Sequence, residues 1–195
     1  NKLSKINQLK DINRLKKSYI IYKSDKGFNL YTDFSKKIIL NNKNVLRFLN
    51  KKRSVKKSKP TDLFIGFFGY ELLNNLIGVK VPKQKSLNFP KGIFYKPEKI
   101  ISFNNKLVYY QKNKFAFKKK FKININQQSY TKIFNKFKKK IKSGETYQIK
   151  ICTKYKMKSK IDPLYLFCRL SQTNLAPESF MIKDKNYSII SCSPE

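Results

Sequence analysis

The sequence predicts an α+β fold in which antiparallel sheets pack against helices. Short runs alternate between apolar and polar residues and are bounded by turn residues, as half-buried strands are. Other runs carry apolar residues every three or four positions, as amphipathic helices do. The second half of the chain has the expected order helix, strand, helix, strand, strand, and strands joined by a short turn pair antiparallel.

The first expected elements form a hairpin. Residues 19–22 and 28–31 are strand-like, and the turn between them contains Asp25 and Gly27, which both favour turns. A short strand over residues 36–40 follows. A brief amphipathic helix comes next, with its apolar residues at Val45, Leu46, Phe48 and Leu49.

An apolar run over residues 63–72 is interrupted by Gly66 and Gly69. Because glycine inside a strand marks a bulge or a close approach of another backbone, we expect one of these features here. Prolines punctuate the residues that follow, and strands are then expected over residues 99–103 and 107–111.

The basic segment 112–126 has little periodicity and is expected to be a connector. Ser129 is placed to cap the next helix, and Gly144 is placed to end it in the left-handed conformation that helix C-termini favour. The apolar residues of this helix share one face, at Tyr130, Ile133, Phe134, Phe137 and Ile141.

The last third of the chain holds three expected elements. Residues 147–157 alternate with period two, which predicts a strand with one buried face. Asp162 followed by Pro163 predicts the start of a helix. Residues 180–182 and 187–192 predict a final hairpin.

The charge of the chain suggests nucleic-acid binding but does not require it. The net charge is +34, from 45 Lys and Arg against 11 Asp and Glu. Arg, the bidentate reader of phosphates and bases, is scarce and occurs only at Arg14, Arg47, Arg53 and Arg169. Lys, Asn, Ile, Phe and Tyr are abundant together, so we interpret the charge as the result of AT-rich coding. The basic cluster at residues 51–59 is interpreted as a solvated loop.

Several function classes are disfavoured. The chain has no His, and its three cysteines, Cys152, Cys168 and Cys192, are widely spaced, which argues against His-ligated metals, His-based nucleophilic catalysis and a disulfide scaffold. No apolar run approaches the roughly 18 residues that span a bilayer, and no signal peptide opens the chain, so we expect a cytoplasmic protein that does not enter a membrane. The chain does not begin with Met, and we expect it to be a fragment.

Several segments, taken in order, resemble one enzyme family. They are Ser143-Gly144-Glu145-Thr146-Tyr147-Gln148, Asp162-Pro163-Leu164-Tyr165, Asn174-Leu175-Ala176-Pro177 and Ser193-Pro194-Glu195. Their spacing is similar to the first part of the chorismate-binding domain shared by anthranilate synthase component I, aminodeoxychorismate synthase component I, and the isochorismate and salicylate synthases. Upstream, Gly66-Phe67-Phe68-Gly69-Tyr70-Glu71 resembles a motif of the two ammonia-using synthases. The resemblance divides the chain into an N-terminal region, residues 1–125, and the truncated start of the catalytic domain, residues 126–195.

The resemblance implies roles for two residues. The ring hydroxyl of chorismate leaves readily only when protonated, and Glu195 resembles the family's general acid, with a pKa that burial and nearby carboxylates would raise. The alternative is that Glu195 caps a strand or pairs with a lysine. The position of Gln148 looks like a lysine in the water-using enzymes, and a neutral glutamine cannot take a proton from water. Gln148 therefore favours ammonia from a glutaminase subunit, unless it is simply a solvent-facing residue.

The product is predicted from the segment after the third motif. Its Ala176-Pro177 pair looks more like aminodeoxychorismate synthase, which predicts 4-amino-4-deoxychorismate for p-aminobenzoate and folate synthesis, with anthranilate as the alternative. In relatives this segment helps form a tryptophan pocket, where Glu178 replaces an apolar residue. The expected pocket, with an allosteric or structural role, involves Asn174, Pro177, Glu178 and Ser179.

Two further expectations concern partners. The resemblance implies a need for Mg²⁺, whose ligands, with most contacts to chorismate, are expected after Glu195, so this fragment is expected to be inactive alone. A more distant alternative is a basic RNA-binding module with exposed aromatic residues. We disfavour it because Tyr147, Ile149 and Ile151 are expected to share a buried face.

Overall fold

The computed structural model describes residues 18–24, 27–51, 59–78, 89–103, 121–174 and 176–193. The chain divides into two compact units, residues 1–111 with 162–195 and residues 112–161, and each is described by itself. Helices and an antiparallel sheet occur together, which confirms the α+β class.

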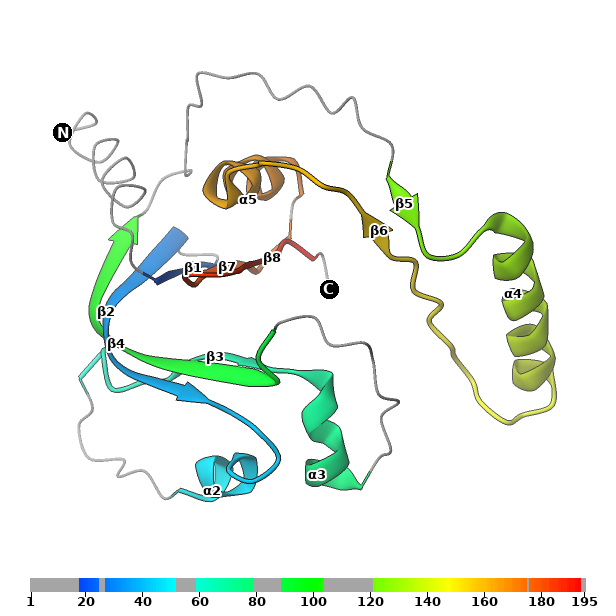
Figure 1. Cartoon of the computed structure of the whole chain (residues 1–195), viewed down its shortest axis with the longest axis horizontal. Helices are drawn as coiled ribbons and strands as arrows, with labels where there is room; N and C mark the ends of the chain where they lie inside the picture. Colours follow the sequence, from blue (N-terminus) through cyan, green and yellow to red (C-terminus); the bar gives the residue numbers. More distant parts are fainter. Residues whose placement is uncertain are drawn as a thin grey trace. The chain divides into compact units, whose positions relative to one another are not determined.

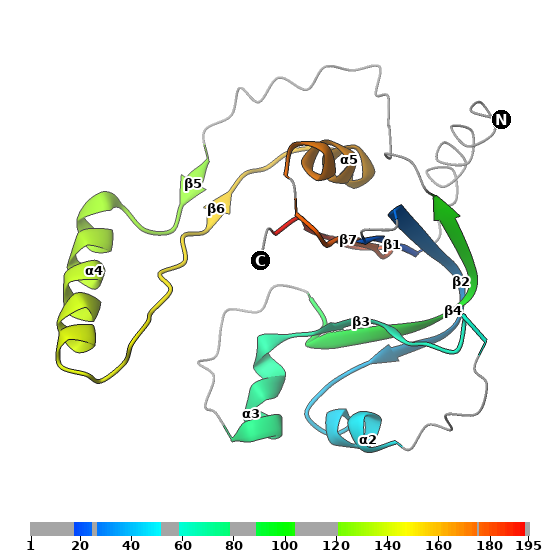
Figure 2. The same cartoon turned by 180° about the vertical axis from the view of Figure 1, so that it is seen from behind.

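The first unit is built on a six-stranded antiparallel sheet with the order β3-β4-β2-β1-β7-β8. Its strands are β1 (Tyr19–Ser24), β2 (Gly27–Ile39), β3 (Ile65–Phe68), β4 (Gly92–Phe103), β7 (Ser179–Lys183) and β8 (Ser188–Ser191). Its helices are α2 (Val45–Asn50), the 3₁₀ turn η1 (Tyr70–Leu72), α3 (Leu73–Ile77) and α5 (Pro163–Thr173). In Figure 1, β2 and β4 curve along the sheet, and α5 lies beside β1 and β7. Figure 2 shows the same arrangement from behind.

Both predicted hairpins are confirmed. β1 pairs with β2 from Ile20 opposite Tyr31 to Ser24 opposite Gly27. β7 pairs with β8, and β7 also pairs with β1, so the C-terminal hairpin extends the sheet formed by the first third of the chain. The division at residues 125 and 126 concerns parts of an enzyme family and stays a prediction.

Strands β2 and β4 are longer than expected. The strand predicted over residues 36–40 is the second part of β2, which continues through a register shift between Phe34 and Lys36. β4 begins at Gly92, seven residues before the predicted start, and includes Pro97. Pro97 pairs with Phe34 beside the register shift, where the missing N–H of proline is tolerated. The strand predicted over residues 107–111 lies outside the described residues.

Helix α5 forms the main core with one face of the sheet. Asp162 caps it, since its side chain accepts a hydrogen bond from the Leu164 N–H at 2.9 Å, and Pro163 occupies the first turn as predicted. Leu164 and Phe167 are fully buried, and each contributes about 1.5–3 kcal/mol through the apolar surface it removes from water. The cluster consists of Tyr19, Ile21, Phe28, Leu30, Leu164, Phe167, Cys168 and Met181.

Gly66 in β3 and Gly69, which follows its end, mark a close backbone approach, as predicted. A Cβ atom on Gly66 would lie 1.9 Å from the carbonyl oxygen of Ile93, and one on Gly69 would lie 2.3 Å from that of Lys91. Ile93 is in the neighbouring strand β4, and Lys91 is the residue before that strand. Only glycine, which has no Cβ atom, lets the chain of β3 lie so close to them.

The second unit contains α4 (Gln127–Lys142) and a two-stranded ladder of β5 (Lys122–Ile123) and β6 (Tyr155–Lys156). The cap of α4 is Asn126 and not Ser129, because the Asn126 side chain accepts from the Ser129 N–H at 2.8 Å. Gly144 has a φ of +77° and ends the helix as predicted. β5 lies in the segment expected to be a connector.

The prediction of a strand with a buried face over residues 147–157 is wrong in extent. Only Tyr155 and Lys156 form a strand, and Tyr147 is 92% exposed. A strand exists only where a partner supplies hydrogen bonds, and its partner among the described residues, β5, is two residues long. Tyr147 is therefore not on a buried face, and RNA binding is no longer disfavoured on that ground.

Candidate functional site

The two predicted catalytic residues belong to different parts of the molecule. Gln148 is exposed in the irregular segment between α4 and β6, where its main-chain carbonyl oxygen accepts a hydrogen bond from the Thr146 hydroxyl at 3.1 Å. Glu195 lies outside the described residues. The preceding strand, β8, ends at Ser191, and the chain is described up to Ser193, two residues before Glu195.

The segment between α5 and β7 holds the four residues of the expected pocket. Asn174 ends α5, and its main-chain N–H donates to the Leu170 carbonyl at 2.8 Å. Pro177 and Glu178 are exposed, whereas Ser179 is buried as the first residue of β7. The pocket formed by these four residues stays a prediction.

Two side chains hold this segment to strands on either side. The Asn174 side-chain amide donates to the Cys192 carbonyl at 3.0 Å, just after β8. The Lys23 ammonium, on β1, donates to the carbonyl of buried Ala176 at 3.0 Å. The connection between α5 and β7 is therefore fixed through its backbone, which leaves the exposed side chains of Pro177 and Glu178 available at the surface.

An apolar cavity of about 390 Å³ lies within the first unit. It is lined by residues of four strands and of the segment that precedes β3, and they are Ile20, Tyr22, Tyr31, Leu63, Phe64, Ile65, Gly66, Phe180 and Ile182. Burial, its largest influence, raises the pKa of Tyr31, so this phenol stays neutral near pH 7. Sequence reasoning missed the cavity because its walls come from segments that only the sheet brings together.

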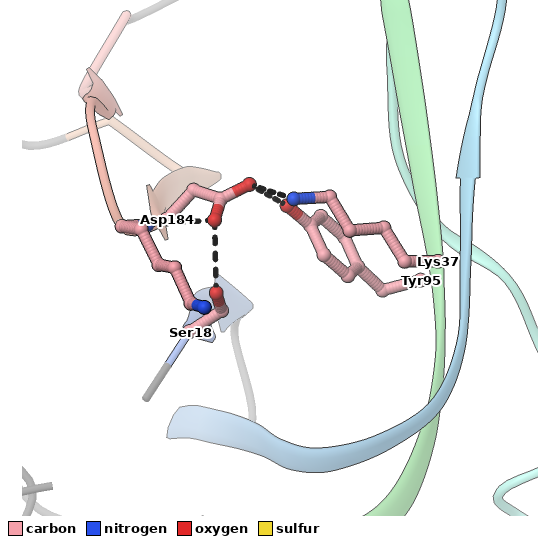
Figure 3. Close-up of polar contacts among 5 residues, drawn as sticks. Ser18, Lys37, Tyr95 and Asp184 are labelled. Atoms are coloured by element: carbon pink, nitrogen blue, oxygen red, sulfur yellow. Dashed lines mark hydrogen bonds and ion pairs between the residues drawn. The ribbon is translucent and has the colours of Figure 1, made fainter. Parts of the chain in front are cut away.

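A buried carboxylate lies at the turn between β7 and β8. Asp184 is 4% exposed and accepts hydrogen bonds from four groups (Figure 3). They are the Ser18 hydroxyl at 3.0 Å, the Lys37 ammonium at 2.6 Å, the Tyr95 hydroxyl at 2.5 Å and the Lys185 N–H at 2.6 Å. Strands β2, β4 and β7 and the residue before β1 thus meet at one side chain.

The electrostatics of Asp184 follow from these contacts. Burial alone would raise the pKa of Asp184, but the hydrogen bonds from Lys37, Tyr95, the Lys185 N–H and Ser18 outweigh burial and hold the pKa well below its usual range. Burial and the hydrogen bond to Asp184 raise the pKa of Tyr95 far above its usual range. Asp184 is therefore a charged acceptor that joins strands, and it was not among the site residues predicted from the sequence.

The described part of the chain holds neither a membrane span nor a metal cluster. None of its helices is long and apolar enough to cross a bilayer. No three of its Cys, Asp and Glu side chains gather where they could hold a metal ion. The described residues thus do not fit a Mg²⁺ site, and the cytoplasmic location stays a prediction.

Comparison with known proteins defines the class. The sequence matches the family described as chorismate binding enzyme over residues 13–195. The chain therefore belongs to this family, which confirms the resemblance carried by its motifs.

Two similar proteins carry the name of a particular enzyme within this family. Anthranilate synthase component 1 of Buchnera aphidicola subsp. Pemphigus spyrothecae is 32% identical over 74 residues, which cover 38% of this chain and 14% of that protein. Anthranilate synthase component 1 of Buchnera aphidicola subsp. Tetraneura caerulescens is 24% identical over 213 residues, which cover 86% of this chain and 40% of that protein. The chain thus spans less than half the length of each of these relatives.

Proposed function

We propose that the full-length protein is a synthase that aminates chorismate with ammonia. The observation that carries the proposal is the family match over residues 13–195, because it supports chorismate as the substrate. Gln148 supports ammonia as the nucleophile, since a neutral amide cannot remove a proton from water, whereas ammonia already carries a free lone pair. A glutaminase subunit would supply the ammonia.

Glu195 has the role of general acid in this proposal. Ammonia forms a bond to a ring carbon, the bond to the ring hydroxyl breaks, and the proton of Glu195 goes to the hydroxyl, which leaves as water. The lone pair of ammonia supplies the electrons of the new bond, and the nitrogen then loses its extra proton to solvent or back to the carboxylate. The support for this role is the Ser193-Pro194-Glu195 motif, which follows a strand that is paired up to Ser191.

Two products are compatible with this chemistry: the aminated ring itself, or anthranilate, which forms when the aminated ring then loses a ring proton and its enolpyruvyl side chain, the latter leaving as pyruvate. The Ala176-Pro177 pair and Glu178 favour 4-amino-4-deoxychorismate, the precursor of p-aminobenzoate. Similarity to an anthranilate synthase component 1 over 86% of this chain favours anthranilate. We place anthranilate first, because that similarity covers most of the chain and the other argument depends on three residues.

The test is a product analysis of the full-length protein. It is incubated with chorismate, Mg²⁺ and an ammonium salt, and the products are separated by chromatography. Anthranilate is the expected product, and 4-amino-4-deoxychorismate would establish the other branch. Isochorismate as the main product would overturn the argument from Gln148, and unchanged chorismate would overturn the proposed function.

A further inference from the structure

Among its described residues, the second unit has no apolar core. Residues 121–161 are all described, and none of them is buried. Their regular structure consists of α4, with 16 residues, and the ladder of β5 and β6, with two pairs. An isolated helix of this length is marginal in water, and a two-stranded ladder is unstable without further packing. The second unit therefore needs another surface to pack against.

Helix α4 leaves an apolar face open to solvent. The five residues of this α4 face are Tyr130, Ile133, Phe134, Phe137 and Ile141. Phe134 is 46% exposed, although phenylalanine is among the residues most often buried. The opposite face carries lysine, for example Lys132 and Lys139. An apolar stripe of this kind is the part of a helix that packs against a core.

The chain between α4 and β6 has the side-chain pattern of a strand but lacks a ladder. It turns back after α4 and returns to β6 (Figure 1), and its residues alternate between partly buried and exposed from Ile149 to Lys154. In the described part of the chain, the ladder with β5 holds Tyr155 and Lys156, and no ladder holds residues 147–153. A strand depends on a partner that exchanges main-chain hydrogen bonds with it. Residues 147–153, the strand segment, thus have the pattern of a strand without a ladder there.

The α4 face and the strand segment lie in strongly basic surroundings. Residues 121–161 contain twelve lysines and a single acidic residue, Glu145, which is paired with Lys140. Two copies of this unit placed face to face would bring lysines against lysines, and like charges brought together repel each other. A surface that fits must therefore be apolar at its centre and carry carboxylates at its rim.

A covering surface within the same polypeptide agrees with the length of related proteins. More than half of each similar anthranilate synthase component 1 lies outside the part that matches this chain. A segment of the same polypeptide is present at an effective concentration on the order of millimolar, so even a weakly binding surface would be occupied.

We infer that the α4 face and the strand segment are docking surfaces for a part of the full-length protein that lies outside this chain. That part supplies a strand that pairs with residues 147–153, an apolar row that covers α4, and carboxylates that meet the surrounding lysines. The pairing also orders the segment that carries Gln148. The inference goes beyond the proposed function, because it does not depend on the reaction that the protein catalyses.

Thiol labelling tests whether the α4 face is covered in the full-length protein. Phe134→Cys places a thiol on this face, and Lys132→Cys is the matched control on the opposite face, because both positions are exposed in the described structure. In the full-length protein, Phe134→Cys should be labelled about 100-fold more slowly than Lys132→Cys, because labelling then requires local opening. In the 195-residue chain alone, the two rates should agree within about threefold, since both thiols are open to solvent.

The native cysteines serve as internal controls. Cys168 is buried and should stay unlabelled in both proteins, which shows that the first unit is folded. Cys152 is exposed in this chain and should be labelled readily in the 195-residue protein. Mass spectrometry assigns each label to its cysteine.

Hydrogen exchange provides a second test that needs no variant. Peptides covering residues 147–153 of the wild-type full-length protein should exchange at least about 100-fold more slowly than an unstructured chain, as amides in a paired strand do. Exchange at the rate of an unstructured chain would show that no strand pairs with this segment, and it would overturn the inference.

Other occupants would give different labelling results, and each of these would overturn the inference. Slow labelling of Phe134→Cys already in the 195-residue chain would place the cover within this chain. Slow labelling that appears only at high protein concentration would indicate a second copy, and slow labelling only with added RNA or anionic lipid vesicles would indicate one of those partners. Equal rates for both variants in the full-length protein would show that the α4 face is uncovered. Neither labelling nor exchange depends on turnover, so the proposed function can fail while the inference stands.

Discussion

At the scale of single residues, Asp184 shows how one buried charge can determine the geometry of a sheet. A carboxylate 4% exposed is costly unless its oxygens are fully hydrogen-bonded, and Asp184 is bonded to donors from β2, β4, the residue before β1 and its own turn. The strand β7 is thereby held against strands far from it in sequence.

Asp184→Asn should destabilise the protein. An amide at this position keeps the shape of the side chain, but it removes the charge that Lys37 pairs with and places an N–H₂ group against other donors. We expect a loss of roughly 2–4 kcal/mol, measured by urea denaturation. Asp62→Asn, which makes the same chemical change at an exposed ion pair with Lys96, should leave the midpoint nearly unchanged.

The same residue predicts how stability depends on pH. The pKa of Asp184 is lower in the folded protein than in the unfolded chain, where it is about 3.9, so the unfolded chain binds more protons as the pH falls. Its stabilisation is fully present above about pH 5 and is lost as the pH falls below about 4. The drop in urea midpoint between pH 5 and pH 3 should be smaller in Asp184→Asn than in the wild type. An equal drop in both would assign the acid sensitivity to other carboxyl groups.

Glu195→Gln tests the predicted acid directly. The amide keeps the size and hydrogen-bonding shape of the side chain but has no transferable proton, so turnover of the full-length enzyme should fall by roughly 10²- to 10⁴-fold. Binding of chorismate should change far less, because most contacts to the substrate are expected from other residues. Turnover within a few fold of the wild type would mean that the proton comes from another group.

At the scale of elements, features that depend on neighbouring residues were predicted well, and features that depend on residues far apart in the sequence were predicted poorly. The hairpin of β1 and β2, the Asp162-Pro163 start of α5 and the Gly144 end of α4 depend on residues within a few positions of each other. The extent of β4 depends on a bulge in β2, and the cavity depends on several strands, so neither is encoded in one window of sequence.

The candidate site follows the same division. Gln148, Asn174 and Glu195 were predicted as site residues because they lie in short motifs with recognisable spacing, and their roles stay predictions. The bond from Asn174 to Cys192 was not predicted, since it joins the end of a helix to a strand 18 residues away. Period-two patterning over residues 147–157 failed for the opposite reason, because alternation does not make a strand where no partner pairs with it.

Gly66→Ala should disrupt the pairing of β3 with β4. An added Cβ atom would lie 1.9 Å from the Ile93 carbonyl oxygen, which is backbone and cannot move as a flexible side chain does. We expect a loss of roughly 2 kcal/mol or more in urea denaturation. Gly78→Ala is the control, because a Cβ atom there would meet no other atom within 4 Å. Its only cost is the backbone strain of an alanine at a φ of +70°. It should cost about 1 kcal/mol, and an equal loss in both variants would mean that the close approach does not limit β3.

At the scale of the whole molecule, the dominant property is a net charge of +34 carried mostly by lysine. Such a charge attracts nucleic acids through release of counterions, whatever the function of the protein. The structure adds Tyr147, which is 92% exposed between Thr146 and Gln148, so an aromatic side chain is available for stacking on a base. Charge and stacking predict different responses to salt and to mutation, and they can therefore be separated.

We expect binding by charge alone. At physiological salt the chain should bind single-stranded RNA weakly, without sequence preference, and its affinity should fall steeply as salt is raised. Tyr147→Ala should leave this affinity unchanged, as should the matched control Tyr155→Ala at a second exposed tyrosine, 63% exposed. Fluorescence anisotropy with labelled RNAs of several sequences measures both effects. If Tyr147→Ala alone lost about 1–3 kcal/mol of binding energy, the loss expected for one stacked base, and one RNA sequence stayed bound at high salt, the excess of lysine would belong to a recognition surface and could not be explained by AT-rich coding.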